Sequence, residues 1–190
     1  MRHMILLFLL LFSSLIFAEI FFSFDSSLGF SWYSEVYAEG KKEIKVITDY
    51  GMQAKFEYGL VRGLRMGAIF SFLNMSIKTQ TDSVNTNFIC VGLSPSFAFD
   101  FLEITSQVSA GVSFVLAGPT GSLAGFGLSG TSNFQGWIYH GQFDFLWELT
   151  DQFSVGFGFG ARFHDLSIPA RSVSVRSLST PIFLKLNYRF

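Results

Sequence analysis

The chain has 190 residues, of which 49% are hydrophobic and only 14% are charged. This length fits a single domain, and the charged fraction lies well below the usual value of about 25%. The formal net charge is −1, so the chain lacks the basic excess that is typical of nucleic-acid-binding proteins. Beyond the N-terminus, no apolar run approaches the roughly 18 to 20 residues that a membrane helix needs. High apolar content without such a run is the composition expected of a membrane β-barrel.

The N-terminal segment, residues 1–18, predicts a cleaved secretory signal peptide. It has a short basic start that includes Arg2, then a long apolar stretch, then Ala18 as a candidate cleavage residue. A retained membrane anchor is the alternative interpretation. If the segment is removed, the mature chain is residues 19–190, and we expect these residues to form one barrel domain.

The mature sequence contains eight segments in which apolar side chains occupy every second position. Side chains of a strand point alternately to its two faces, so each segment predicts a strand with one apolar and one polar face. The last segment is the clearest example: Ile182, Leu184, Leu186, Tyr188 and Phe190 alternate with Pro181, Phe183, Lys185, Asn187 and Arg189. The predicted strands run approximately over residues 22–33, 46–60, 64–72, 89–100, 102–114, 136–148, 153–164 and 181–190.

The connections between these strands alternate between long and short. Polar or glycine-rich loops are expected at about 34–45, 78–87, 116–131 and 165–177, and tight turns join the other strand ends. This alternation is typical of an up-and-down outer-membrane barrel. The sequence therefore predicts an all-β fold, an eight-stranded antiparallel up-and-down transmembrane β-barrel in which the first strand pairs with the last.

The distribution of charges favours a membrane barrel over a water-soluble one. None of the eight aromatic faces carries Asp, Glu, Lys or Arg, and an Arg or Lys that faced the middle of a bilayer would cost roughly 2 to 4 kcal/mol. A soluble barrel of the lipocalin kind, the alternative, would place its charges outward and its large apolar groups inward.

The opposite faces should line the barrel interior, where we predict a network of paired charges because unpaired buried charges are costly. The predicted network comprises Asp25, Lys55, Glu57, Arg65, Glu103, Asp144, Glu148, Arg162, Lys185 and Arg189. Pro95 and Pro181 lie inside predicted strands although neither can donate a ladder hydrogen bond, so a bulge or a local irregularity is expected at each.

With these features, the chain resembles the small eight-stranded outer-membrane proteins, the group that contains the OmpA transmembrane domain, OmpX and OmpW. The terminal strand with Tyr188 and Phe190 is similar to the signal that the barrel assembly machinery recognises in its clients. The resemblance implies export, insertion by that machinery, an outer-membrane location with contact to lipopolysaccharide or another outer-leaflet lipid, and a monomeric state.

Three functions remain open at the level of sequence. The interior of an eight-stranded barrel is just wide enough to be filled by side chains, which favours a largely plugged lumen and a structural or surface-interaction role through the external loops. The alternative is a narrow pore for ions or small solutes.

A lipid-modifying enzyme is the third possibility, because small barrels with that activity use His with Ser and an acid near the outer rim. His164, Asp165 and Ser167 lie close together in sequence, but their spacing matches no catalytic motif. We therefore expect no enzymatic activity. The sequence also predicts no cofactor and no metal site, and it leaves any ligand-binding residues unknown. Cys90 is the single cysteine, so it cannot form an intrachain disulfide.

Overall fold

The computed structural model describes residues 19–38, 41–44, 46–61, 63–78, 83–101, 104–118, 133–169 and 172–190, and the statements below concern these residues. Within these ranges, no helix is long and apolar enough to cross a membrane. The predicted signal peptide, Glu103 and most of the predicted glycine-rich loop lie outside the described residues.

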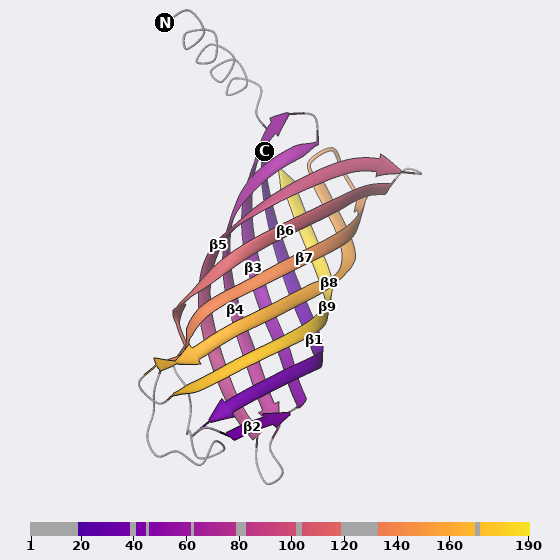
Figure 1. Ribbon diagram of the computed structural model, residues 1–190. Helices are drawn as coiled ribbons and strands as arrows, with labels where there is room; N and C mark the ends of the chain where they lie inside the picture. The colour runs from indigo at the N-terminus through magenta and orange to yellow at the C-terminus, as the bar shows by residue number, and fades with distance from the viewer. Residues whose placement is uncertain are drawn as a thin grey trace, which may run out of the picture.

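The described chain forms one antiparallel sheet that closes on itself (Figure 1). Its strands are β1 (Ile20–Ala38), β2 (Lys41–Ile44), β3 (Val46–Val61), β4 (Leu64–Lys78), β5 (Ser83–Phe101), β6 (Ile104–Ala117), β7 (Gln135–Glu148), β8 (Phe153–Ile168) and β9 (Val173–Arg189). Each long strand pairs with the next, and β1 pairs with β9. β2 is a short addition that pairs with the last residues of β1. The predicted ring of eight antiparallel strands is therefore confirmed.

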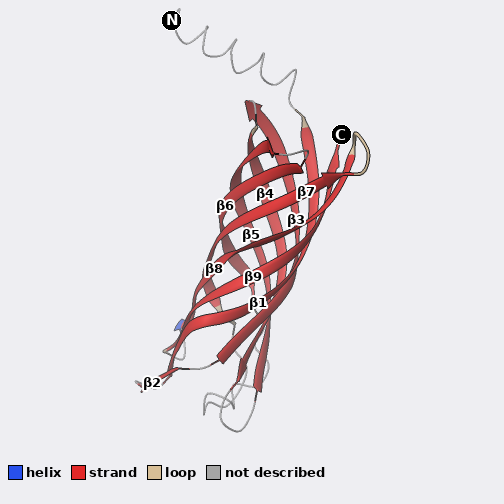
Figure 2. Ribbon diagram, turned by 90° about the vertical axis from the view of Figure 1, so that its right-hand side faces the viewer, coloured by secondary structure: helices blue, strands red, loops and turns tan. Residues whose placement is uncertain are grey.

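The two ends of the barrel differ in their connections. The short turns after β3, β5 and β7 lie at the same end as Ile20 and Phe190, where the Phe190 amide donates to the Ile20 carbonyl at 2.9 Å. We call this the terminal end and the opposite one the loop end. Figure 2 shows the strands running between these ends with a pronounced tilt, which a closed barrel requires.

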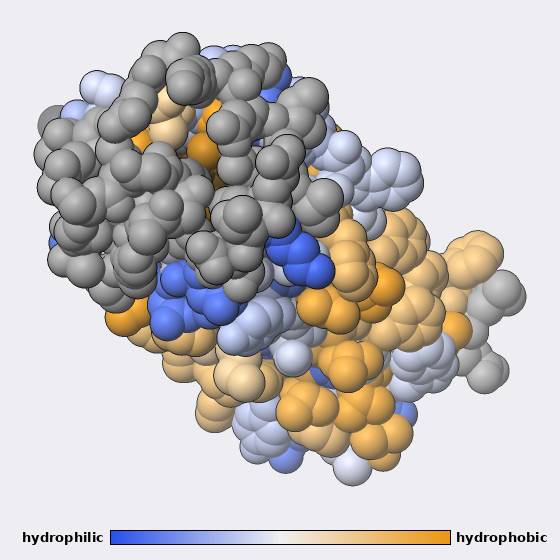
Figure 3. All heavy atoms as spheres, turned by 90° about the horizontal axis from the view of Figure 1, so that it is seen from below, coloured by the Kyte–Doolittle hydropathy of each residue, from blue (hydrophilic) through white to orange (hydrophobic). Residues whose placement is uncertain are grey.

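The outer wall of the barrel is apolar over most of its height. Exposed hydrophobic side chains cover every strand of the ring, and Leu184 (67% exposed) and Leu93 (59% exposed) are typical members. Figure 3 shows hydrophobic side chains over the wall and hydrophilic ones close to the loop end. Water would penalise so large an apolar surface, whereas a bilayer would solvate it. The predicted orientation of the two faces is confirmed.

The strands extend further at the loop end than the sequence predicted. β4 continues to Lys78 and β5 begins at Ser83, while β8 continues to Ile168 and β9 begins at Val173. The loops expected at 78–87 and 165–177 are therefore too long. The polarity of these segments favours loops, but in the structure their polar side chains alternate with apolar ones along paired strands.

In these extensions the polarity of the two faces is reversed. Apolar side chains point inward and form a buried cluster, the loop-end core, whereas outward positions such as Asn85 and Arg176 are exposed to solvent. The loop-end core contains Val36, Ile47, Leu73, Met75, Ile77, Phe88, Cys90, Val115, Phe134, Ile138, Leu166, Ile168, Val173 and Val175. Polar groups outward and apolar groups inward are the arrangement of a water-soluble barrel, so these extensions have the surface expected of a part that stands in water.

The prolines cause interruptions in pairing but no shift of register at their own positions. The β5–β6 ladder pairs Leu93 with Val112 and then Ser96 with Ser109, so it passes over Pro95. The β8–β9 ladder passes over Pro181 in the same way, while the β1–β9 ladder retains it. The predicted irregularities are present as local gaps, because each proline lacks the donor that one neighbour would need.

Candidate functional site in the barrel interior

A charged layer crosses the lumen between the terminal end and the middle of the barrel. Lys185 Nζ donates to Asp144 Oδ2 at 2.8 Å and to Gln107 Oε1 at 3.1 Å. Gln107 Nε2 in turn donates to both oxygens of Glu57 at 3.0 and 3.1 Å, and Lys55 lies 3.2 Å from the same carboxylate. Because these residues come from β9, β7, β6 and β3, side chains from opposite walls meet inside the barrel.

Glutamines extend this layer to β1. Gln142 Nε2 donates to Asp144 Oδ1 at 2.7 Å and reaches Asp25 Oδ2 at 3.5 Å, and Gln53 reaches the same Asp25 oxygen at 3.4 Å. Asp25 is thus held by amide groups, and its Oδ1 is buried without a hydrogen-bond partner among the described residues. An orphan acceptor of this kind is the place where an internal water is expected.

A second charged layer lies closer to the loop end. Arg162 pairs through Nη1 with Asp49 Oδ1, and it donates through Nη2 to Ser27 Oγ at 3.1 Å. Ser179 donates to the other oxygen of Asp49. His164 completes the group, because its Nε2 lies 4.0 Å from Asp49 Oδ2. All of these side chains are almost fully buried, directly beneath the loop-end core.

Glycines provide the space for these charges. A Cβ built on Gly29 would lie 2.6 Å from Asp49 Oδ1, and one built on Gly158 would clash with Asp144 Oδ1. A Cβ added to Gly156, Gly158 or Gly160 would clash with a backbone carbonyl oxygen of β7. The glycines of β8 therefore accommodate groups from the neighbouring strand.

The structure divides the residues of the predicted charge network into separate groups. Asp25, Lys55, Glu57, Asp144 and Lys185 lie in the first layer, as the contacts above describe. Arg162 lies in the second layer. Three more lie at the terminal end, where they line a cavity: Arg65, Glu148 and Arg189. Glu103 lies outside the described residues.

Sequence reasoning missed several residues that hold the layers together. Asp49 is the partner of Arg162 and lies on the inward face of β3 with Gln53 and Lys55, although it is absent from the predicted network. Gln107 and Gln142 are uncharged, and the predicted network contained charged residues alone. Their position between carboxylates and Lys185 depends on which strands face one another across the lumen.

The residues considered for catalysis do not come together. His164 points into the barrel and its Nδ1 lies 3.0 Å from Ser177 Oγ, whereas Asp165 points outward and accepts from Arg176 Nε at 3.1 Å. The hydrogen bond and the carboxylate of Asp165 raise the pKa of the exposed Arg176. His164, Ser177 and Asp49 form a buried polar group, and each is at most 1% exposed. Among the described residues, no group of His, Cys, Asp and Glu is placed to hold a metal ion.

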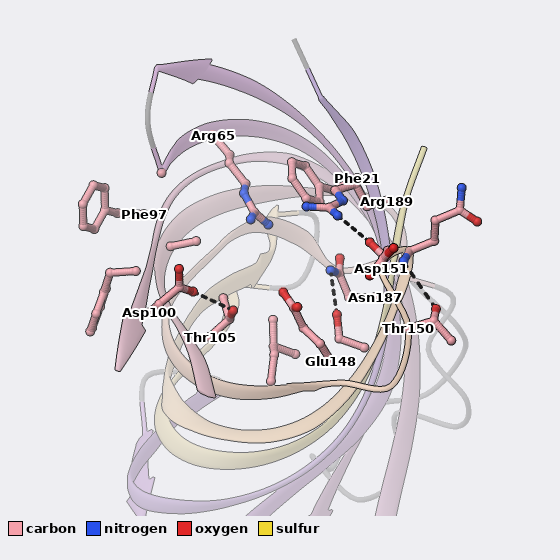
Figure 4. Close-up of a pocket in the computed structure, with 16 residues that line it drawn as sticks. Phe21, Arg65, Phe97, Asp100, Thr105, Glu148, Thr150, Asp151, Asn187 and Arg189 are labelled. Carbon is pink, nitrogen blue, oxygen red and sulfur yellow. Dashed lines mark hydrogen bonds between the residues drawn. The ribbon is translucent and has the colours of Figure 1, made fainter. Parts of the chain in front are cut away.

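A cavity of about 550 Å³ opens at the terminal end (Figure 4). Its walls carry charges of both signs, and part of them is already paired. Asp100 accepts from Thr105 Oγ1 at 2.8 Å, and Arg189 donates to the Asp151 carbonyl at 2.6 Å. The Arg65 guanidinium stands over the Phe21 ring at 3.5 Å from its centroid. The charged layers lie deeper in the barrel than this cavity.

Comparison with known proteins finds similarity at the level of structure. No family model matches the chain, and no curated protein matches its sequence. Among solved structures, OprG from Pseudomonas aeruginosa superposes with a TM-score of 0.58 at 11% identity, covering 90% of this chain and 96% of that one. AlkL, determined in lipid bilayers, superposes with a TM-score of 0.54 at 15% identity, covering 91% and 90% of the two chains.

Together with the closed ring and the apolar wall, these likenesses define the class of protein. The chain is a small eight-stranded β-barrel of the outer-membrane type. Within that class it has the up-and-down architecture of the OmpA, OmpX and OmpW group, as the resemblance in sequence predicted. At 11% and 15% identity, these comparisons support the fold alone.

Proposed function

We propose that the protein is an integral outer-membrane barrel that does not conduct and that acts as a structural or surface-interaction protein through its loop end. The observation that carries this proposal is the filling of the lumen at successive levels. The first charged layer joins β9, β7, β6 and β3 across the lumen, and the second joins β8 and β9 to β1 and β3. The loop-end core above them buries apolar side chains such as Ile77 and Val175 at 0% exposure. An ion on this path would have to break buried ion pairs and then cross an apolar plug.

Single-channel recording in planar bilayers tests this proposal directly. The mature protein would be refolded in detergent, and folding would be checked by its shifted migration when unboiled. We expect a folded and electrically silent barrel. A double variant, Lys185→Met with Asp144→Asn, should also be silent, because the loop-end core remains in place. Reproducible discrete conductance steps of the wild-type barrel would contradict the proposal.

A narrow pore is the second candidate, and one observation favours it. Polar atoms of Ser23, Asp25, Ser109 and His140 are buried in the interior without a hydrogen-bond partner. Such atoms are usually satisfied by water, so they support a partly hydrated lumen. If the recordings show conductance, these residues and Lys185 are the positions at which substitutions should alter it.

The architecture also implies how the barrel is oriented in the membrane and which partners each part of it meets. The terminal end would face the periplasm and the loop end the exterior, with lipopolysaccharide or another outer-leaflet lipid around the wall. Trp32 (81% exposed), Trp137 and Tyr139 lie on the outer face towards the loop end, which supports an aromatic belt at that interface. Tyr188 and Phe190 would form the signal for the assembly machinery, after export with removal of residues 1–18. A monomer is sufficient for a closed ring.

We propose further that the protein has no catalytic activity. The buried group of His164, Ser177 and Asp49 supports this interpretation, because it lies under the loop-end core without access for a lipid substrate. Lipid A mass profiles of cells with and without the protein test the proposal. A mass change that depends on His164 would overturn it.

A further inference from the structure

The cavity at the terminal end, which we call the terminal-end cup, is lined by charged groups that are only partly paired with one another. It is lined by polar and charged side chains from several strands, and the charged layer of Lys185, Asp144 and Glu57 lies beyond it. Its volume of about 550 Å³ falls in the range of small-molecule sites, which lies at about 300 to 1,000 Å³. A ligand here would be bound from the side of the termini.

One wall of the cup offers an unused cationic donor. Arg65 lines the cavity and is half-buried, and no carboxylate of the described residues forms an ion pair with its guanidinium. The Phe21 ring beneath the guanidinium fixes its plane. A planar guanidinium pairs best with a carboxylate.

The facing wall carries a carboxylate and an amide side chain. Asn187 lines the cavity, and its amide nitrogen reaches Ser154 Oγ at 3.5 Å. Glu148 is exposed and forms no hydrogen bond or ion pair with any other described residue. Figure 4 shows Glu148 and Arg65 pointing into the cavity from different sides, with Asn187 beside Glu148. Acceptors of this kind suit an ammonium group.

We propose that the terminal-end cup binds a short peptide that carries both a free carboxylate and a free ammonium group. Arg65 would receive the carboxylate, and Glu148 with Asn187 would receive the ammonium. A simple anion would meet repulsion from Glu148, Asp100 and Asp151, and a simple cation would meet repulsion from Arg65 and Arg189. A dipolar ligand, which carries one charge of each sign, is therefore the class of ligand that matches both walls. This inference does not depend on whether the lumen conducts.

The test is an NMR titration of the refolded mature barrel with alanyl-alanine. We expect saturable shifts of amides around the cup, such as those of Thr105 and Asn187, and none in the loop-end core. N-acetylation of the peptide and amidation of its carboxyl group should each weaken binding at least tenfold, since each removes one charge. If the N-acetylated and the amidated peptides both bind as tightly as alanyl-alanine, the charged ends do not contribute to binding and the proposal is wrong.

Variants provide the matched controls. Glu148→Gln and Arg65→Gln should each weaken binding of alanyl-alanine at least tenfold, whereas Arg176→Gln at the opposite end should leave it unchanged. Glu148 is exposed, so its substitution keeps the test valid even if the Arg65 variant does not fold. Absence of saturable shifts with the wild-type barrel, or equal affinity of the Glu148 variant, would overturn the proposal.

Discussion

At the scale of single residues, Lys185 is the side chain on which the first charged layer depends. It is 1% exposed and contacts both Asp144 and Gln107. Replacing it by methionine keeps the length of the side chain but leaves the Asp144 carboxylate without its cation. Removal of one partner of a buried pair costs about 3 to 5 kcal/mol. We expect Lys185→Met to lower the free energy of unfolding by about this amount, measured by reversible urea unfolding from lipid vesicles.

The double variant Lys185→Met with Asp144→Asn is the control for this prediction. It removes both charges, so most of the lost stability should return. Arg176→Gln breaks the solvent-exposed pair with Asp165 and should leave the unfolding curve unchanged, because exposed ion pairs contribute little. A single variant as stable as the wild type would show that the Lys185–Asp144 pair does not form.

At the scale of elements, the extensions of β8 and β9 behave as parts of a soluble barrel. Val175 is fully buried in the loop-end core, and the adjacent Ser174 is partly exposed on the other face. We expect Val175→Asp to lower the free energy of unfolding by about 3 kcal/mol or more, since it places an unpaired charge in an apolar core. Ser174→Asp should have little effect. Equal responses in urea titrations would mean that the extensions do not pair as described.

The loop-end core also predicts the reactivity of the single cysteine. Cys90 is 0% exposed and belongs to this core. A thiol reagent needs access to the sulfur, so we expect no labelling of the folded barrel by a maleimide and complete labelling in urea. Rapid labelling of the folded protein would show that the loop-end core is open.

At the scale of the whole molecule, the apolar wall determines the position of the protein in a bilayer. Leu184 lies on the lipid-facing side of β9, midway between the loop-end extension and Tyr188. We expect Leu184→Arg to destabilise the barrel folded in vesicles by about 2 to 4 kcal/mol, because a charge near the midplane is costly. Ser174→Arg, on the same strand but above the lipid, should cost little. A barrel that stands in water would show no difference between the two.

The alternation of side chains was sufficient to predict the ring of strands and the face that each side chain takes. It was insufficient at the strand ends near the loops, where the segments around Asn85 and Ser174 are polar enough to look like loops. A strand that leaves the membrane retains its period but exchanges the polarity of its faces. Periodicity alone does not show where that exchange occurs, because it is set by the height of the surrounding lipid.

In the lipid-facing part of each strand, the sequence alone was enough to predict which side chains face inward, because the period of a strand is fixed. It also determined that these residues carry charges of both signs. The folded barrel was needed to show that Lys185 meets Asp144 and Gln107, 41 and 78 positions away, and that Arg162 meets Asp49. It was also needed to show that Arg65 and Glu148 form no ion pair with another described residue. The reason is physical: contacts across a lumen depend on the closure and stagger of the whole ring, which no single strand encodes.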